Sequence, residues 1–229
     1  MYDFKYHRAT SIGGAQSTFK SSDDPVYLAG GMTLLPTMKL RLASPSDVID
    51  IGQLDGLTGV ERSGDEIVVK AMTTHAEVAA SAAVATAIPA LGSLADSIGD
   101  PHVRNRGTIG GSIANNDPAA DYPAALVGLG SVVVTTSRKI EADGFFTNMF
   151  ETALKPDELI TAVRFQIPEA ACYMKFPNPA SRYALVGVMV ARTNDGVRVA
   201  VTGAGPCVFR ATEMETALTA DFKPEAIAS

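Results

Sequence analysis

The sequence predicts an α+β fold, and three observations support that prediction. The N-terminal part contains a strand–helix–strand unit that ends near Gly52. A hairpin signal follows, because the turn-like Arg62-Ser63-Gly64-Asp65 separates two β-prone runs. A second hairpin is predicted further along the chain, where Asn194-Asp195-Gly196 joins two more such runs. Helical patterns lie between these strands, so the class is mixed.

The strand–helix–strand unit is predicted from its turn residues and its apolar spacing. Residues 25–29 form a short β-prone run that stops at Gly30-Gly31. A helix is expected to follow, with Thr33 as its N-cap. Its apolar positions share one face at the i, i+4, i+8 spacing, and they are Leu34, Leu35, Met38 and Leu42. Pro45 is expected to end this helix, before a strand over residues 47–51.

The middle of the chain combines helix signals with a long glycine-rich stretch. Thr74 is expected to cap an Ala-rich helix that runs to Ala87, and a second helix covers residues 90–98. Residues 99–122 predict a long loop with little regular structure, and such loops are more often functional than not. The other predicted elements are helices over residues 119–128 and 211–218 and strands over 57–61, 66–71, 131–135, 161–167, 185–192 and 197–202.

A domain boundary is predicted at Pro168–Glu169, where the strand over residues 161–167 ends. Residues 1–168 would form one domain, with subdomains of about 1–52 and 53–168. Residues 169–229 would form a C-terminal domain. The segment 176–182 holds two prolines and is interpreted as a linker or an ordered loop.

The composition excludes several classes of protein. The formal net charge is −6, the pI is about 5.1, and no Lys/Arg cluster is present, which argues against nucleic-acid binding. The longest apolar stretches are far shorter than the roughly 20 residues that span a bilayer, and the N-terminus lacks a signal-peptide pattern. Cys172 and Cys207 lie far apart, outside any metal-binding motif, so no metal site is expected. We therefore expect a cytoplasmic protein without a membrane span.

Two glycine pairs are the candidate binding elements. Glycine allows positive φ and a close approach of the backbone, so successive N–H groups can point at phosphate oxygens. Gly30-Gly31, which precede a helix, fit a pyrophosphate cradle, and so do Gly110-Gly111 with the hydroxyls of Thr108 and Ser112. Taken alone, each pair is a weak signal, because a bare Gly-Gly between a strand and a helix is usually a tight turn. Neither belongs to GxGxxG or GxxxxGK[ST], which argues against a Rossmann site and a P-loop.

The two glycine segments resemble two FAD motifs of a known family. Residues 25–36 (PVYLAGGMTLLP) are similar to the first FAD motif of the medium subunit of carbon monoxide dehydrogenase and its relatives, the molybdenum hydroxylases. Residues 99–112 (GDPHVRNRGTIGGS) are similar to the second. The match continues through residues 114–123 and at 145–147, 158–160 and 201–204, in family order over nearly the whole chain.

The resemblance implies a fold and a function. The fold would be the two-subdomain FAD-binding fold of the p-cresol methylhydroxylase type, followed by a small α+β C-terminal domain. The protein would be an FAD-dependent oxidoreductase subunit that passes electrons from the [2Fe–2S] clusters of a small subunit, through FAD, to an external acceptor. A molybdopterin large subunit would complete the heterotrimer, and two heterotrimers would form a heterohexamer.

The resemblance also assigns pyrophosphate contacts. Residues 29–33 and 108–112 would contact the pyrophosphate, and Leu28 and Leu34 would flank the first loop. Ile98 would lie near the adenine or the ribose.

Other positions would contact the rest of the dinucleotide. Asp121 would bond the ribose side, Ile160 would pack on the isoalloxazine, and Lys175 and Tyr183 would lie near that ring. Asp117 is included, although it could instead cap the helix that follows, because Asp-Pro-Ala-Ala is a natural helix start. The complete predicted set is Leu28, Ala29, Gly30, Gly31, Met32, Thr33, Leu34, Ile98, Thr108, Ile109, Gly110, Gly111, Ser112, Asn115, Asp117, Asp121, Ile160, Lys175 and Tyr183. No catalytic residue is assigned.

The sequence departs from the family pattern at three places. Met32-Thr33 stands where many relatives carry a polar residue and Ser, and Ser112 replaces a common Asn. The C-terminal domain is expected to be shortened. Two other functions stay open: a flavin-free assembly subunit of the same fold, and a free-standing flavin oxidoreductase. His75 is expected to be a partly exposed residue beside a helix cap, and His102 a satisfied loop histidine near the second motif.

Overall fold

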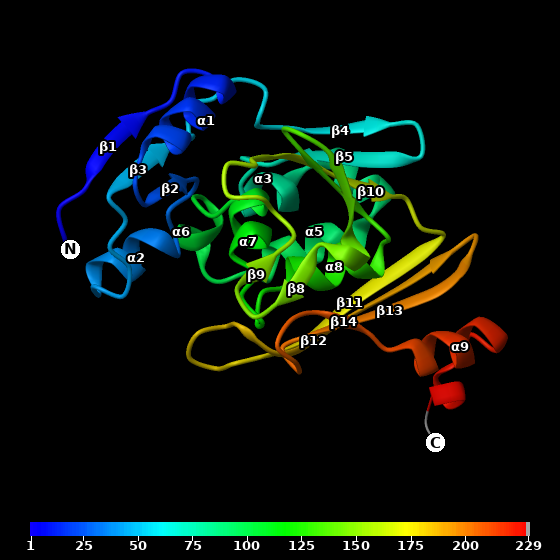
Figure 1. Cartoon of the computed structure of the whole chain (residues 1–229). Helices are drawn as coiled ribbons and strands as arrows, with labels where there is room; N and C mark the ends of the chain where they lie inside the picture. Colours follow the sequence, from blue (N-terminus) through cyan, green and yellow to red (C-terminus); the bar gives the residue numbers. More distant parts are fainter. Residues whose placement is uncertain (228–229) are drawn as a thin grey trace.

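The computed structural model describes residues 1–227 and arranges them around three main β-sheets (Figure 1). The N-terminal sheet has the strand order β1-β3-β2 and is parallel. The central sheet has the order β4-β5-β10-β6-β7 and is antiparallel. The C-terminal sheet has the order β11-β12-β13-β14 and is also antiparallel. The α+β prediction is confirmed.

The N-terminal sheet contains the predicted strand–helix–strand unit. Its core is formed by apolar side chains on β3 and the first helix, such as Ile49 and Ala15, which are fully buried. The first helix begins at Ser11, whose hydroxyl accepts a hydrogen bond from the Gly14 N–H at 3.0 Å. The elements are β1 Lys5–Arg8, α1 Ile12–Ser21, β2 Pro25–Leu28, α2 Leu34–Lys39 and β3 Asp47–Asp50.

Helix α2 is shorter than the sequence predicts. It ends at Lys39 rather than at Pro45, because Arg41 adopts a left-handed conformation with φ of 61°. The Leu42 N–H then donates to the Thr37 carbonyl, and the Arg41 N–H donates to Met38, which together form a Schellman motif. Leu42 is 76% exposed, so its predicted place on the buried face is wrong. The Thr33 side chain makes no capping bond.

The central sheet is formed by two hairpins and a strand that inserts between them. Strand β10 lies between β5 and β6, with Val163 paired to Val69 and to Val133. Figure 1 shows helices packed between this sheet and the C-terminal sheet. Its strands are β4 Val60–Ser63, β5 Glu66–Lys70, β6 Val132–Thr135, β7 Lys139–Glu141 and β10 Ile160–Gln166. Between β7 and β10 lie the short 3-10 turn η1 Ala142–Gly144 and a separate antiparallel pair of strands, β8 Phe146–Asn148 and β9 Glu151–Thr152.

The helices of the central part differ from the prediction in two respects. The Ala-rich helix is broken at Ser81, whose extended backbone ends one helix while its hydroxyl caps the next by accepting from the Val84 N–H. The stretch predicted as an irregular loop contains two short helices, capped by Asp100 and Thr108. The helices are α3 His75–Ala80, α4 Ala82–Ala87, α5 Pro89–Asp96, α6 Pro101–Arg104, α7 Ile109–Asn115 and α8 Tyr122–Gly128.

The C-terminal sheet shares its core with the central helices. Met189, Ala191 and Ala200 are fully buried in the same cluster as residues of α5 and α8. Phe176 and Pro177, interpreted from the sequence as part of a linker, instead complete strand β11, and the turn begins at Asn178. The elements are β11 Ala170–Pro177, β12 Ala184–Thr193, β13 Gly196–Thr202, β14 Phe209–Arg210, α9 Thr212–Ala220 and the short 3-10 turn η2 Pro224–Ile227.

Two features are absent from residues 1–227. No helix there is both long enough and apolar enough to cross a membrane. In the same range, no group of three or more His, Cys, Asp or Glu side chains is arranged to hold a metal ion.

Candidate functional site

One cavity of about 650 Å³ lies between the N-terminal sheet and the central helices and extends to the turn between β11 and β12. It is lined by both glycine segments and by most of the predicted site residues. Three predicted residues lie outside its lining. Ile109 is fully buried in the core, Leu28 packs behind Gly31, and Lys175 contacts the lining residue Asp121 from behind.

The first glycine loop presents free backbone donors to this cavity. Gly31 has φ of 76°, which an L side chain rarely adopts. Among residues 1–227, no N–H group from Ala29 to Thr33 donates a hydrogen bond within the chain. A run of unpaired N–H groups beside a cavity is a ready anion cradle. A Cβ on Gly30 would lie 1.9 Å from the Arg106 carbonyl oxygen, so the two loops meet at a contact that only glycine permits.

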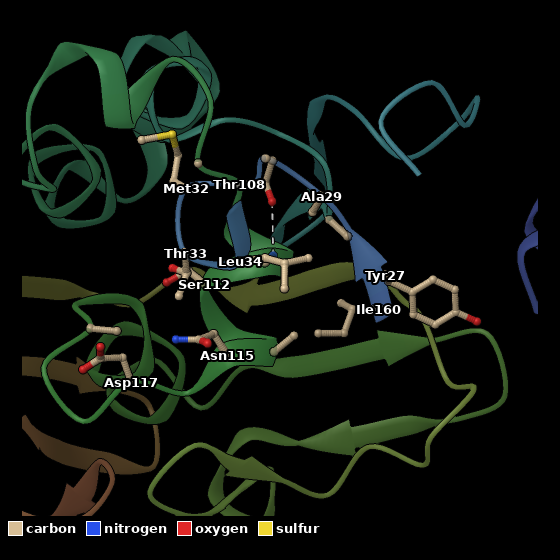
Figure 2. A pocket seen from close by; sticks show the side chains of 18 of the residues that line it. Tyr27, Ala29, Met32, Thr33, Leu34, Thr108, Ser112, Asn115, Asp117 and Ile160 are labelled. Carbon is tan, nitrogen blue, oxygen red and sulfur yellow. Dashed lines mark hydrogen bonds between the residues drawn. The ribbon is translucent and has the colours of Figure 1, made fainter. Parts of the chain in front are cut away.

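The second glycine pair is built differently from the first. It lies in the first turn of α7, where the Gly110 N–H donates to the Ala71 carbonyl and the Gly111 N–H to the Thr108 hydroxyl. A Cβ on Gly110 would lie 2.7 Å from the Ala71 carbonyl oxygen. This pair therefore lets α7 approach the central sheet closely. Ser112 and Asn115 on the same helix face the cavity (Figure 2).

One end of the cavity is apolar and lies between the N-terminal and central sheets. Tyr27 stacks on Phe19 with ring centroids 4.7 Å apart, and its hydroxyl donates to the Asp157 carbonyl at 3.3 Å. Burial, with a smaller contribution from the Asp157 charge, raises the pKa of Tyr27 to about 12. Leu159 and Ile160 also contribute to the wall of this end. We call this part the Tyr27 end.

Glu158 fixes the strand that carries this wall. Its side chain is 1% exposed and accepts from the Arg138 guanidinium at 3.0 Å and the Thr135 hydroxyl at 2.6 Å. The Ser137 hydroxyl and the Lys155 N–H also donate to it. Burial acts to raise the pKa of Glu158, but these hydrogen bonds outweigh it and lower the pKa to about 2.

The other end of the cavity is polar and borders the turn between β11 and β12. Asp121 is 4% exposed and pairs with the Lys175 ammonium at 2.9 Å and the Tyr173 hydroxyl at 2.5 Å. Burial raises the pKa of Asp121, although Lys175 acts in the opposite direction. Tyr183 is 46% exposed at the mouth, and burial together with the charges of Asp117 and Asp121 raises its pKa. We call this part the Tyr183 end.

The structure separates residues that the sequence analysis grouped together. Ile160 was assigned to the same ring as Lys175 and Tyr183. Figure 2 shows Ile160 beside Tyr27, on the far side of α7 from Asp117, which lies near Tyr183. Asp117 accepts from the Ala119 N–H in a turn, and helix α8 begins only at Tyr122, so the alternative role as a helix cap is wrong.

One of the two histidines differs from the expectation. His75 is only 4% exposed and lines the cavity, whereas the His102 side chain is 96% exposed and does not. Burial, with a smaller contribution from Arg104, lowers the pKa of His75 to about 4. The local signal in the sequence was the capping box of Thr74 and Glu77, which predicts the helix start but not the side of the helix that is buried.

Comparisons with known proteins agree with this geometry. A family model for the FAD binding domain in molybdopterin dehydrogenase matches residues 2–169. The chain is 37% identical to the nicotine 6-hydroxylase medium subunit of Paenarthrobacter nicotinovorans, over 96% of this chain and 82% of that one. It is 35% identical to the carbon monoxide dehydrogenase medium chain of Hydrogenophaga pseudoflava, over 90% of this chain and 77% of that one. The structure of carbon monoxide dehydrogenase from Hydrogenophaga pseudoflava that lacks the Mo-pyranopterin moiety of its cofactor matches with a TM-score of 0.93 at 35% identity, over 99% of this chain and 84% of that one.

The fold and the cavity together define a flavin-binding oxidoreductase subunit. The chain belongs to the family of FAD-binding medium subunits of molybdenum hydroxylases, which includes the carbon monoxide dehydrogenase and xanthine dehydrogenase types. The predicted resemblance, fold class and cofactor are confirmed.

The residues present fit FAD. An extended dinucleotide needs an anion cradle between two flat pockets, and the free N–H groups of residues 29–33 lie between the Tyr27 end and the Tyr183 end. A Cβ on Gly30 would meet the Arg106 carbonyl and a Cβ on Gly31 would meet Leu35 and Leu28, so a side chain at either position would displace the loop that forms the cradle.

Proposed function

We propose that this protein is the electron-transfer subunit of a molybdenum hydroxylase complex, which passes electrons from the [2Fe–2S] clusters of a partner subunit through FAD to an external acceptor. The carrying observation is that the five successive N–H groups from Ala29 to Thr33 have no partner among residues 1–227 and border a cavity long enough to have two distinct ends. FAD supplies the redox chemistry, because it exchanges one electron or two. The chain supplies binding, orientation and shielding from water.

We propose that the isoalloxazine lies at the Tyr183 end and the adenine at the Tyr27 end. A ring that exchanges electrons with other proteins needs access to the surface, and Tyr183 is half exposed. The Tyr27 end offers stacked aromatic and aliphatic side chains, which suit an adenine. In this arrangement Ile98 and Asp121 serve the flavin side and Ile160 serves the adenine, which exchanges the roles that the resemblance first implied for Ile98 and Ile160.

The orientation is tested with ligands that lack one end of FAD. Tyr27→Leu should weaken binding of FAD and ADP about tenfold and leave the absorption maxima of bound flavin unchanged. Tyr183→Ala should shift those maxima and leave ADP binding unchanged. Titrations of both variants with FAD, FMN and ADP measure which end of the dinucleotide each tyrosine contacts. The opposite pairing of effects would show that the dinucleotide binds in the reverse direction.

The partners we propose are an iron–sulfur small subunit and a molybdopterin large subunit, arranged as a dimer of heterotrimers. The proposal draws on the names of the relatives, which are medium subunits or medium chains of larger enzymes. We also propose the cytoplasm as the compartment, because Cys172 and Cys207 are both free thiols, as is usual where glutathione keeps thiols reduced.

The proposed function is tested by cofactor loading and by reduction. The purified chain should be yellow, or should become yellow on incubation with FAD, at one FAD per chain. Co-expression with the neighbouring iron–sulfur and molybdopterin subunits should give a complex whose flavin is reduced by substrate. A chain that assembles with partners yet stays colourless with excess FAD would instead be a flavin-free assembly subunit. Turnover by the isolated chain would identify a free-standing flavin oxidoreductase.

A further inference from the structure

A continuous stack of groups connects the first glycine loop to the protein core. A Cβ on Gly30 would lie 1.9 Å from the Arg106 carbonyl oxygen and 3.1 Å from the Gly107 Cα. On the other side of that peptide, a Cβ on Gly107 would lie 2.6 Å from His75 Nε2. The His75 ring in turn lies 5.3 Å from the fully buried ring of Tyr122. The loop, the peptide, the imidazole and the phenol therefore pack in successive layers, and there is no room for an added methyl group at Gly30 or at Gly107.

Backbone hydrogen bonds hold the middle of this stack in register. The His75 N–H donates to the Gly107 carbonyl at 3.0 Å, and the Ile109 N–H donates to the Thr73 carbonyl at 3.1 Å. Thr74 and Thr108 form an isolated antiparallel bridge. The starts of α3 and α7 are thus joined, and the His75 side chain is the part of this junction that fills the space beneath the 106–107 peptide.

Polar atoms within the stack do not account for the presence of a histidine. Among residues 1–227, His75 Nδ1 and the Tyr122 hydroxyl are both buried without a hydrogen-bond partner. Leaving such atoms unpaired costs stability. The contacts of His75 with the layers above and below it are therefore contacts of its ring.

We propose that His75 is a positioning residue for the FAD cradle: its ring sets the height of the Arg106–Gly107 peptide, and that peptide sets the position of the Gly30 loop whose N–H groups hold the pyrophosphate. This inference rests on the proposed function and adds His75 to the site residues that the sequence predicts. A smaller side chain at residue 75 would let the peptide and the loop sink toward Tyr122, which would misalign the free N–H groups from Ala29 to Thr33.

The experiment measures FAD affinity of the full chain by flavin fluorescence quenching. His75→Ala should weaken FAD binding at least about tenfold, whereas His75→Phe, which keeps a flat ring of similar thickness, should stay within about threefold of the wild type. His102→Ala is the matched control, because His102 is an exposed histidine just before the same loop and should have no effect.

A second substitution approaches the same contact from the other side. Gly107→Ala should also weaken FAD binding, because its new methyl group meets the His75 ring. In the double variant His75→Ala/Gly107→Ala the methyl group gains room, and affinity should recover above that of either single variant. If FAD affinity recovers when the second substitution is added, the losses in the single variants come from mispositioning of the loop and not from general damage to the fold. The double variant can be measured even if His75→Ala is unstable, because the methyl group introduced by Gly107→Ala fills the space left by the imidazole.

The outcomes separate the two proposals. A wild-type chain that binds no FAD refutes the proposed function. A wild-type chain that binds FAD while His75→Ala binds equally well overturns the positioning role. Equal losses of FAD affinity in His75→Phe and His75→Ala would also overturn the positioning role, because the imidazole itself would then contact FAD.

Discussion

Replacement of Gly30 by alanine is expected to remove FAD from this protein. The new Cβ would lie 1.9 Å from the Arg106 carbonyl oxygen and 2.7 Å from its carbonyl carbon, and both are backbone atoms that cannot rotate away. The first loop must move, and its five free N–H groups move with it. We expect the FAD dissociation constant to rise by at least about 100-fold, which corresponds to roughly 3 kcal/mol. Fluorescence titration of the purified chain with FAD measures the change.

The matched control for this substitution is Gly13→Ala. Gly13 lies in helix α1, and a Cβ there meets no heavy atom within 4 Å. Alanine is favoured over glycine inside a helix by roughly 0.5–1 kcal/mol, so this variant should keep FAD and melt slightly higher. Full flavin occupancy in Gly30→Ala would show that the first loop does not hold the pyrophosphate.

The placement of the first glycine pair between a strand and a helix could be predicted from the sequence, but the helical conformation of the second pair could not. Gly30-Gly31 follow a strand, and their proximity to a helix is a local pattern. Gly110-Gly111 were expected in a loop, because two glycines disfavour a helix by about 2 kcal/mol in total. The helix forms nevertheless, since Thr108 caps it and Gly110 packs directly on Ala71. That contact joins residues 39 positions apart and has no signature in either segment.

The same limit applies to the two ends of the cavity. Ile160, Lys175 and Tyr183 lie in the same part of the sequence, so the resemblance of motifs gives no reason to place them at different ends of the cavity. The fold places β10 in the central sheet and β11 in the C-terminal sheet. Lys175 is buried on β11 because Asp121 on the neighbouring helix start neutralises it, and that pairing depends on how the two layers pack.

Substitution of Glu158 by glutamine is expected to cause a large loss of stability, because it breaks the ion pair between this buried carboxylate and the partly exposed Arg138. The carboxylate is 1% exposed and accepts hydrogen bonds from Arg138, Thr135, Ser137 and the Lys155 N–H. Its folded pKa of about 2 lies below its ordinary value of 4.5, so the charged form stabilises the fold. Such a pKa shift corresponds to about 3 kcal/mol of the free energy of unfolding. A chain of this size that loses this contribution should melt roughly 6–10 °C lower.

The pH dependence identifies this contribution. Because the folded pKa of Glu158 is lowered, its stabilisation is complete above pH 4.5 and is lost as the pH falls from 4.5 toward 2. In Glu158→Gln that part of the acid-induced loss should disappear, whereas the wild type should show it in denaturant titrations at each pH. Glu169→Gln is the control, because Glu169 and Arg192 form an ion pair of 2.9 Å with both side chains 47% exposed, and such pairs contribute less than about 1 kcal/mol. Equal losses in the two variants at pH 7 would mean that burial of Glu158 adds nothing. Since Glu158 directly precedes Leu159 and Ile160, flavin affinity in Glu158→Gln should fall together with stability, and in Glu169→Gln it should not change.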